Sequence, residues 1–336
     1  MKVGIKAIEY FLPEEVLTNE QLELIYEDWT AEKIFEKTGI NQRHVVKEGE
    51  LASDLAFEAA KKLFDSKVIS PCEVEFILLA TQSPDYILPT TACVLQDRLG
   101  LPDTVGSLDF NLGCSAFIYG LALAKGLIAT GVVKNVLLIT AETYSKHINP
   151  LDKSTRTIFG DAAAATLICE GEDVHEIGDF DLGTDGSGAD NLIIPAGGMK
   201  MPKTELTAIE EVDDSRCTRC QDNLYMNGAE VFNFTISRVP ATVENILRKS
   251  YLTKENIDLF VFHQANKFML DFLRKKLRIP AEKFYINIQD IGNTVSASIP
   301  IALKRAEAEM LINKNDKVML VGFGVGLSWG STILTW

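Results

Sequence analysis

The sequence predicts an α/β fold in which buried strands lie between layers of helices. Short apolar runs rich in branched residues alternate with helical patterns along the whole chain, and the clearest span 76–80, 136–140, 259–262 and 318–323. Strands that are apolar on both faces and separated by helices are typical of a sheet covered on both sides. The 336 residues, 46% of them hydrophobic, suffice for a large core and indicate roughly two domains.

One order of elements occurs twice: strand, helix, strand, a glycine-led turn, helix, strand. In the first copy, a strand at 76–80 and a helix at 90–99 are followed by a second strand and by the turn at Gly113-Cys114. A helix at 115–129 and a strand at 134–139 complete this copy. In the second copy, a strand at 259–263, a helix at 267–277 and a strand at 283–288 lead to the turn at Gly292-Asn293. A helix at 296–310 and a strand at 316–321 complete this copy. We therefore predict two duplicated halves, 1–172 and 173–336, packed about a pseudo-twofold axis. Equivalent strand ends would then converge on one place, which is where open α/β sheets bind ligands.

Cys114 is the candidate nucleophile. It follows Gly113 at the predicted start of a helix of small residues. A helix N-terminus offers partial positive charge and free backbone N–H groups, and both stabilise a thiolate. The competing interpretation is a buried cysteine that serves only as a small apolar side chain.

His263 and Asn293 are the candidate partners of this cysteine. His263 closes the apolar run 259–262, and Asn293 follows a glycine just before a predicted helix. An asparagine amide N–H in that place can stabilise developing charge on a substrate oxygen. Each residue also has an ordinary structural interpretation, as a core histidine bonded to backbone and as a helix N-cap.

The glycine-rich stretch 322–330 follows a strand but leads into a second alternating run at 327–335. A dinucleotide-binding loop should open a helix, so we reject that interpretation. We expect the backbone to approach the active site here, with the N–H of Gly326 offered to an oxyanion.

Charge and composition exclude several classes of function. The net charge of −14 argues against nucleic-acid binding, which needs a basic surface. No window of about 20 apolar residues lacks charge, and the N-terminus has no signal-peptide pattern, so we predict a cytoplasmic protein without a membrane span. The six scattered cysteines fit a reducing compartment. The one basic concentration comprises Lys267, Arg274, Lys275, Lys276 and Arg278, which is either a solvated helix face or a docking surface.

Several motifs in order along the chain resemble the beta-ketoacyl-acyl-carrier-protein synthase III family, which has the thiolase-like fold. They are 37–40 (KTGI), 89–93 (PTTAC), 113–117 (GCSAF), 159–162 (FGDA), 226–232 (MNGAEVF), 263–266 (HQAN), 292–294 (GNT) and 322–330 (GFGVGLSWG). The resemblance implies a five-layered αβαβα sandwich, a homodimer, and Cys114, His263 and Asn293 as catalytic residues. It also implies an oxyanion hole made by the backbone of Cys114 and Gly326, and Leu88 reaching the acyl pocket of the partner subunit.

The resemblance further implies a two-stage reaction without a metal or redox cofactor. Cys114 takes an acyl group from an acyl thioester, and malonyl-acyl-carrier protein is then decarboxylated and condensed to a 3-ketoacyl product that initiates fatty-acid synthesis. The basic cluster of Lys267, Arg274, Lys275 and Lys276 would dock the acidic carrier protein.

Two positions depart from the family pattern. Housekeeping members clasp the CoA adenine with a tryptophan and an arginine, and these positions here hold Lys33 and Lys153. A lysine neither stacks like tryptophan nor offers a guanidinium plane. The acyl donor is thus bound either to CoA or to carrier protein. One alternative is a specialised synthase III-like acyltransferase or condensing enzyme of secondary-metabolite or surface-glycan biosynthesis, and a second is an inactive partner subunit.

The polar segment 199–223 has no counterpart in the duplication and is predicted to be a loop insertion. It contains Cys217 and Cys220, which have the spacing of half a zinc site. Since no second pair with ligand spacing appears, we favour an ordinary loop.

Overall fold

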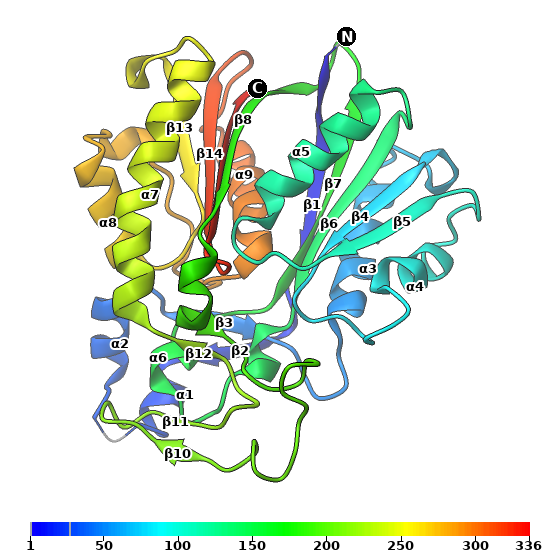
Figure 1. The fold of residues 1–336 in the computed structure, drawn as a ribbon. Coiled ribbons are helices and arrows are strands. Elements are labelled where there is room, and N and C mark those ends of the chain that lie inside the picture. The colour runs from blue at the N-terminus through cyan, green and yellow to red at the C-terminus, as the bar shows by residue number, and fades with distance from the viewer. Residues whose placement is uncertain (1, 27) are drawn as a thin grey trace.

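The computed structural model describes residues 2–26 and 28–336, and nine strands of these residues form one mixed sheet (Figure 1). Residues 1–172 contribute β1 (Val3–Phe11), β4 (Phe76–Ala80), β5 (Gly106–Phe110), β6 (Asn135–Glu142) and β7 (Ala162–Glu170). Residues 173–336 contribute β8 (His175–Thr184), β13 (Leu259–Phe262), β14 (Lys317–Gly324) and β15 (Ser328–Thr335). The strand order is β13-β14-β15-β8-β1-β7-β6-β4-β5.

The two halves of this sheet have matching order and direction. β4 pairs parallel with β6 and β13 pairs parallel with β14, and in both halves the next two pairings are antiparallel. The halves meet where β1 pairs with β8, through Gly4 opposite Glu176 and Ile5 opposite His175. Equivalent strands therefore lie on opposite sides of this central junction.

The prediction of a strand at 283–288 is wrong. Ala281–Lys283 forms a 3-10 turn after Pro280, and only one bridge, between Phe260 and Phe284, continues the sheet. The backbone N–H of Asn287 instead donates to the side-chain oxygen of Gln264, at 2.6 Å. A side chain thus takes the place of the neighbouring strand, and the second half lacks a full counterpart of β5.

Helices form three layers around the two half-sheets, which gives the five-layered αβαβα sandwich (Figure 1). The outer layers contain α3 (Ala52–Asp65) and α4 (Thr91–Arg98) on one side, and α7 (Gly228–Lys249) and α8 (Lys267–Lys276) on the other. The central layer contains α5 (Ala116–Ala129) and α9 (Ser298–Ala308). One apolar core joins the central helices to strands of both halves.

The central helix α5 approaches the sheet closely because its residues are small. A Cβ at Gly120 would lie 2.5 Å from a methyl carbon of Leu138 on β6. Close approach buries Phe117 and Leu121 completely, and each such side chain contributes roughly 1.5–3 kcal/mol of burial free energy. The position of Cys114, just before this helix, is consequently set by the core of both halves.

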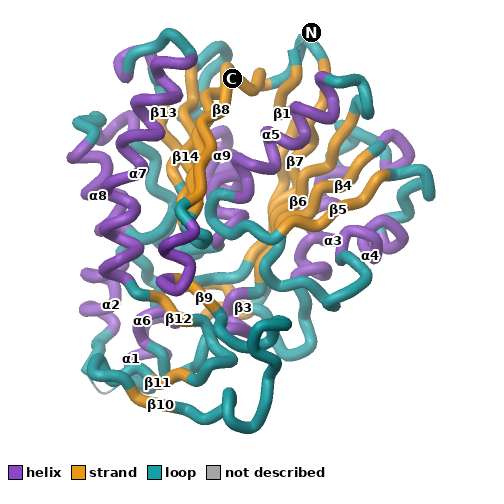
Figure 2. The backbone as a smooth tube through the Cα atoms, in the orientation of Figure 1, coloured by secondary structure: helices purple, strands orange, loops and turns teal. Residues whose placement is uncertain are grey.

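The remaining elements gather below the sheet, at the end where β4, β6 and β13 finish (Figure 2). They are β2 (Glu15–Thr18), α1 (Asn19–Glu23), α2 (Ala31–Thr38), β3 (Gln42–Val45), α6 (Lys153–Arg156), β9 (Leu192–Ile193), β10 (Glu211–Val212), β11 (Thr218–Arg219) and β12 (Tyr225–Met226). Within the described residues, no helix has both the length and the apolar character needed to cross a membrane.

Candidate active site

Cys114 lies in the tight turn between β5 and α5. The N–H of Ala116 donates to the carbonyl of Gly113 at 2.8 Å, and Cys114 is only 6% exposed. Its sulfur faces the end of β14, since a Cβ at Gly324 would lie 3.0 Å from Sγ. The lack of a side chain at Gly324 therefore leaves the space that the Cys114 sulfur occupies.

His263 directly follows β13, and its N–H donates to the carbonyl of Val321 at 2.8 Å. Its Nδ1 lies 2.7 Å from the Ser298 hydroxyl, which donates to the carbonyl of Val295 at 2.9 Å. In this arrangement Nδ1 carries the ring proton and Nε2 keeps a free lone pair. Burial lowers the pKa of His263 to about 3, so the imidazole is neutral at pH 7.

Asn293 is held on both sides by backbone hydrogen bonds. Its N–H donates to Ile158 at 2.9 Å, and its carbonyl accepts from Gly160 at 3.0 Å. Its side-chain oxygen accepts from the N–H of Val295 at 2.9 Å. The N-cap residue of the turn that follows is Thr294, so the N-cap interpretation of Asn293 is wrong. With the oxygen engaged, the amide Nδ2 group is left to face outward as a donor.

The turn after Asn293 is conformationally strained. Val295 has a φ of +54°, a left-handed conformation that is rare for a β-branched side chain. Strain of this kind costs on the order of 1–3 kcal/mol and persists only where surrounding contacts hold it. Here the bonds of Asn293 and Ser298 to the N–H and carbonyl of Val295 hold the turn.

The three predicted residues come together on one cavity of about 80 Å³. Cys114, His263 and Asn293 line it from three separate elements, with a largely apolar remainder. The other lining residues are Ile158, Phe159, Leu192, Met226, Gly228, Val231, Ala265, Asn266, Met269, Phe323 and Gly324. The arrangement offers a nucleophile, a neutral base and an amide donor in a setting from which water is largely excluded.

The electrostatics of the sulfur differ from our expectation. Burial raises the pKa of the Cys114 thiol, and Glu142 raises it further once that carboxyl is ionised, whereas we expected the helix start to lower it. Loss of solvation outweighs the helix-end effect in a cavity this closed. The resting cysteine is thus a thiol, and its activation requires a base.

Glu142 is a buried acid beside the site that sequence reasoning missed. It ends β6, is fully buried, and accepts from the backbone N–H of Gln82 at 2.9 Å and from the Ser296 hydroxyl at 2.8 Å. Burial raises its pKa to about 8, and the hydrogen bonds from its two neutral partners offset this effect only in part. A charged residue closing the run 136–141 was the available signal.

Gly326 lies in the turn between β14 and β15 and lines a second cavity of about 440 Å³. Gln82, Asn111 and Tyr144 line the same cavity, and Leu192 lines both cavities. The glycine in contact with the sulfur is Gly324. The role of Gly326 as an oxyanion donor remains a prediction.

Lys33 and Lys153 gather around Asp28. The ammonium of Lys153 is buried and contacts both carboxylate oxygens of Asp28, at 2.7 and 2.9 Å. Lys33 donates to the backbone carbonyl of Asp28 at 2.7 Å and lies 5.8 Å from the ring of Trp29. The charge of Lys153 is therefore already paired within the chain.

The four basic residues assigned to carrier docking lie on α8. Lys267 pairs with Asp271 one turn away, and Arg274 also lies near that carboxylate, at 3.9 Å. Lys276 donates to the backbone of Ile236 at 2.8 Å. Lys275 is exposed on the same helix.

Leu88 lies in a projecting loop between β4 and α4. Tyr86, Ile87 and Leu88 are 61%, 87% and 79% exposed. Three consecutive apolar side chains in solvent are unusual in a monomer and indicate an interaction surface.

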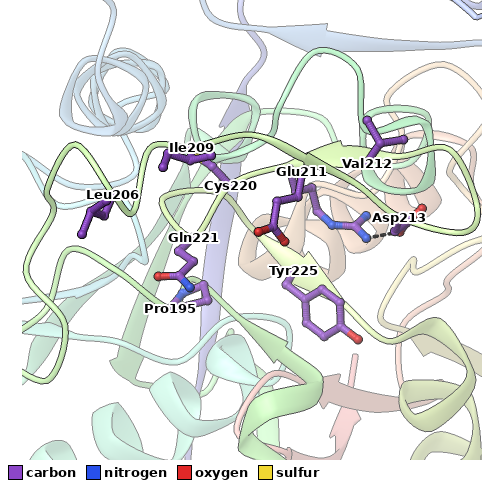
Figure 3. Close-up of a pocket in the computed structure, with 10 residues that line it drawn as sticks. Pro195, Leu206, Ile209, Glu211, Val212, Asp213, Cys220, Gln221 and Tyr225 are labelled. Atoms are coloured by element: carbon purple, nitrogen blue, oxygen red, sulfur yellow. Dashed lines mark hydrogen bonds and ion pairs between the residues drawn. The ribbon is translucent and has the colours of Figure 1, made fainter.

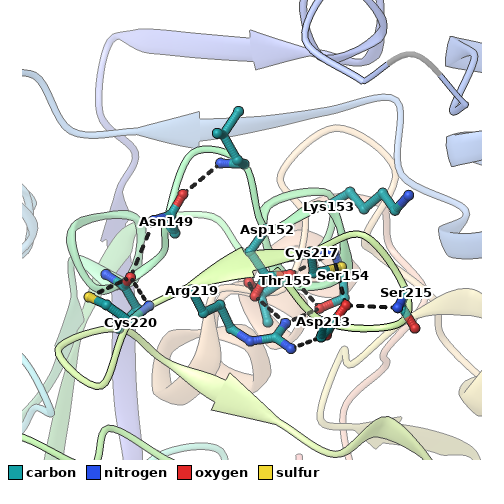
Figure 4. Close-up of polar contacts among 12 residues, drawn as sticks. Asn149, Asp152, Lys153, Ser154, Thr155, Asp213, Ser215, Cys217, Arg219 and Cys220 are labelled. Carbon is teal, nitrogen blue, oxygen red and sulfur yellow. Dashed lines mark hydrogen bonds and ion pairs between the residues drawn. The ribbon is translucent and has the colours of Figure 1, made fainter. Parts of the chain in front are cut away.

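The insertion 199–223 is anchored to the segment that carries Lys153. Its small hairpin, β10 and β11, encloses a surface hollow of about 360 Å³ with Pro195 and Tyr225 (Figure 3). Arg219 binds Asp152 at 3.0 Å and also pairs with Asp213 (Figure 4). Asp152 is fully buried, so this charge-assisted contact holds the insertion firmly.

Cys217 and Cys220 are both free thiols within this hairpin. The N–H of Cys217 donates to Asp213 at 2.9 Å, and the thiol of Cys220 donates to the side chain of Asn223 at 3.1 Å. Within residues 2–26 and 28–336, no group of three potential ligands is placed to hold a metal ion. The pair takes part in the local turns of the insertion.

Two duplicated half-sheets around a central helical layer, with cysteine, histidine and asparagine on one cavity, define a thiolase-like enzyme. Residues 108–186 match 3-oxoacyl-[acyl-carrier-protein (ACP)] synthase III, and residues 247–336 match its C-terminal region. The chain belongs to the beta-ketoacyl-[acyl-carrier-protein] synthase III family, and it is an acyltransferase of the condensing type.

Individual relatives agree over the full length. The chain is 38% identical to the beta-ketoacyl-[acyl-carrier-protein] synthase III of Caldanaerobacter subterraneus subsp. tengcongensis, covering 99% of this chain and 97% of the relative. It is 39% identical to the synthase III of Clostridioides difficile, covering 100% and 98%. A crystal structure of a 3-oxoacyl-(acyl-carrier-protein) synthase III superposes with a TM-score of 0.98 at 49% identity, covering all of both chains.

Proposed function

We propose that the protein forms a 3-ketoacyl thioester by decarboxylative condensation on Cys114 and so initiates fatty-acid synthesis. The observation that carries the proposal is the shared cavity of Cys114, His263 and Asn293. The names of the full-length relatives support acyl-carrier protein as the partner. The proposed chemistry uses only these side chains and two thioesters, without a metal or redox cofactor.

Acylation begins with transfer of the thiol proton. His263 is neutral with its Nε2 lone pair free, so it accepts the proton of Cys114 as the sulfur attacks the donor carbonyl. The bond to the leaving thiolate then breaks, and the imidazolium returns the proton to that thiolate. We propose the backbone N–H groups of Cys114 and Gly326 as donors to the oxyanion.

Condensation uses the same cavity after the first thiol leaves. Asn293 Nδ2 donates to the thioester carbonyl of malonyl-carrier protein, and the negative charge of the enolate develops there as carbon dioxide departs. His263 also donates from Nε2 in its other neutral tautomer, in which the ring proton has moved from Nδ1 to Nε2 through solvent exchange and the Ser298 hydroxyl turns from Val295 to donate to Nδ1. The enolate carbon attacks the acyl-cysteine, and the carbon–sulfur bond breaks to give the 3-ketoacyl product. The departing Cys114 thiolate takes up one proton from solvent and returns to the thiol.

The electrostatics favour a carrier-protein partner at α8. Lys275 is exposed on a chain whose net charge is −14, so local positive charge there would steer an acidic carrier. The pairing of Lys153 with Asp28 weakens the case for a CoA phosphate at that position. We propose acyl-carrier protein or acyl-CoA as the donor, with the carrier-bound form favoured.

We further propose a homodimer. β5 is an edge strand of the sheet, its Leu108 is 44% exposed, and the projecting loop at Leu88 adds a second apolar surface. Unprotected edge strands and contiguous apolar surfaces are normally covered by a partner. Leu88 would then reach the acyl pocket of the other subunit.

The six free cysteines agree with a cytoplasmic enzyme.

Intact-mass spectrometry tests the proposal directly. The protein is incubated with acetyl, butyryl and longer acyl donors on CoA and on carrier protein, and malonyl-carrier protein is then added. We expect one acyl adduct, absent in Cys114→Ala, followed by a 3-ketoacyl product. An acyl adduct that never condenses would favour the specialised acyltransferase, and failure of every donor to modify Cys114 would favour the inactive partner subunit.

A further inference from the structure

Polar side chains follow three neighbouring strands at the same edge of the sheet. Gln82 comes shortly after β4, Asn111 directly follows β5, and Tyr144 begins a 3-10 turn after β6. β4 pairs parallel with both β5 and β6, so the carboxyl ends of the three strands lie together. The three side chains consequently line one cavity, of about 440 Å³.

The hydrogen bonds among these side chains have one direction. The hydroxyl of Tyr144 donates to Gln82 Oε1 at 2.6 Å, and Gln82 Nε2 donates to Asn111 Oδ1 at 3.0 Å. Burial raises the pKa of Tyr144 well above its usual value, so the phenol keeps its proton. Each amide oxygen therefore already accepts one hydrogen bond from a neighbouring side chain.

Three amide N–H groups are left without a protein partner. Gln82 retains one and the exposed Asn111 retains two, and none of these has a protein acceptor within residues 2–26 and 28–336. The rest of the lining is mostly apolar and includes Leu112, Leu192, Ile193, Ile194 and Leu224. A ligand that satisfies this cavity brings an acceptor oxygen on an otherwise apolar body.

The cavity adjoins the nucleophile. Leu192 lines both cavities, and a Cβ at Gly113 would lie 2.5 Å from Gln82 Oε1. The ring centre of Tyr144 is 5.1 Å from that of Phe159, which lines the cavity of Cys114. An acyl chain bound to the sulfur that extended past Phe159 would therefore reach the hydrogen-bonded side chains of Tyr144, Gln82 and Asn111.

We propose that Gln82 and Asn111 make the enzyme selective for an acyl group that carries a hydroxyl or carbonyl oxygen along its chain. This inference rests on the proposed acylation of Cys114. An alkyl chain would remove water from the amide N–H groups without replacing their hydrogen bonds, whereas an oxygenated chain replaces them. One neutral hydrogen bond corresponds to roughly a tenfold preference between chains of equal length.

Acylation kinetics on the full-length protein test the selectivity. The donors are hexanoyl pantetheine and matched hexanoyl chains with a hydroxyl or keto group at each position from the third to the fifth carbon. We expect at least one oxygenated chain to acylate Cys114 about tenfold more efficiently than hexanoyl, as judged by mass gain over time. In Gln82→Leu the ratio should fall towards one.

Two further variants separate selectivity from damage to the fold. Tyr144→Phe keeps the ring and removes the hydroxyl that orients Gln82, so the ratio should fall in part. Gln289→Leu makes the same change as Gln82→Leu at an exposed position outside the cavity and should leave the ratio unchanged.

The outcomes distinguish this inference from the proposed function. If hexanoyl acylates and condenses as efficiently as every oxygenated chain, the selectivity is refuted and the condensing function stands. A preference that survives in Gln82→Leu also refutes it. If no member of the panel acylates Cys114, both are overturned.

Discussion

Replacement of Glu142 by glutamine tests the electrostatics beside the nucleophile. Its carboxyl accepts from the N–H of Gln82 and bonds the hydroxyl of Ser296, and no cation balances it in these contacts. The Ser296 hydroxyl can also accept a hydrogen bond, so a glutamine whose Oε1 takes the Gln82 N–H can donate from Nε2 to Ser296 without titrating. Glu142→Gln should therefore fold normally and remove one pH-dependent contribution to stability.

The magnitude and sign follow from the raised pKa of Glu142, which burial moves from 4.5 to about 8. The folded state holds the proton more tightly, so the stabilisation is complete below about pH 4.5 and is lost as pH rises to about 8. The difference of about 3.5 pH units corresponds to at most roughly 5 kcal/mol, at 1.36 kcal/mol per unit. Relaxation of the site would reduce this to a few kcal/mol.

Urea denaturation between pH 5 and pH 8.5, at fixed protomer concentration, provides the assay. The wild-type protein should lose a few kcal/mol of unfolding free energy relative to Glu142→Gln over this range. Glu282→Gln, at an exposed position, should run parallel to the wild type. If the difference in unfolding free energy between the wild type and Glu142→Gln stays constant within about 1 kcal/mol over this pH range, Glu142 is not a neutral buried acid.

Four other changes have defined outcomes. Asn293→Ala should slow malonyl decarboxylation roughly 10²–10³-fold and acylation much less; equal losses would contradict its role. Ser298→Ala should slow condensation about tenfold in stopped assays, with partial recovery in Ser298→Thr, because the imidazole loses its hydrogen bond to the hydroxyl at 298. Lys275→Glu should raise KM for carrier-protein substrates severalfold at low salt but not for pantetheine thioesters. Leu88→Asp should shift the proposed dimer towards monomer in sedimentation, and an unchanged mass would speak against that interface.

Local sequence patterns predicted most of the framework. The strands at 76–80 and 259–262 have the predicted bounds, and the helices predicted at 90–99 and 267–277 end within a residue of α4 and α8. Apolar periodicity reports which faces are buried, and this information lies within each short segment. The duplication also predicted that Cys114, His263 and Asn293 would converge, which they do on one cavity.

Quantities that depend on distant neighbours required the tertiary structure. The buried acid Glu142, the raised pKa of Cys114 and the pairing of Lys153 with Asp28 all arise from residues far apart in the chain. Solvation and charge–charge distance set these properties, and neither is encoded by residue type or spacing. The sequence by itself thus determined the layers and the reacting side chains. Only packing decided their protonation and the polar lining that an acyl chain would meet.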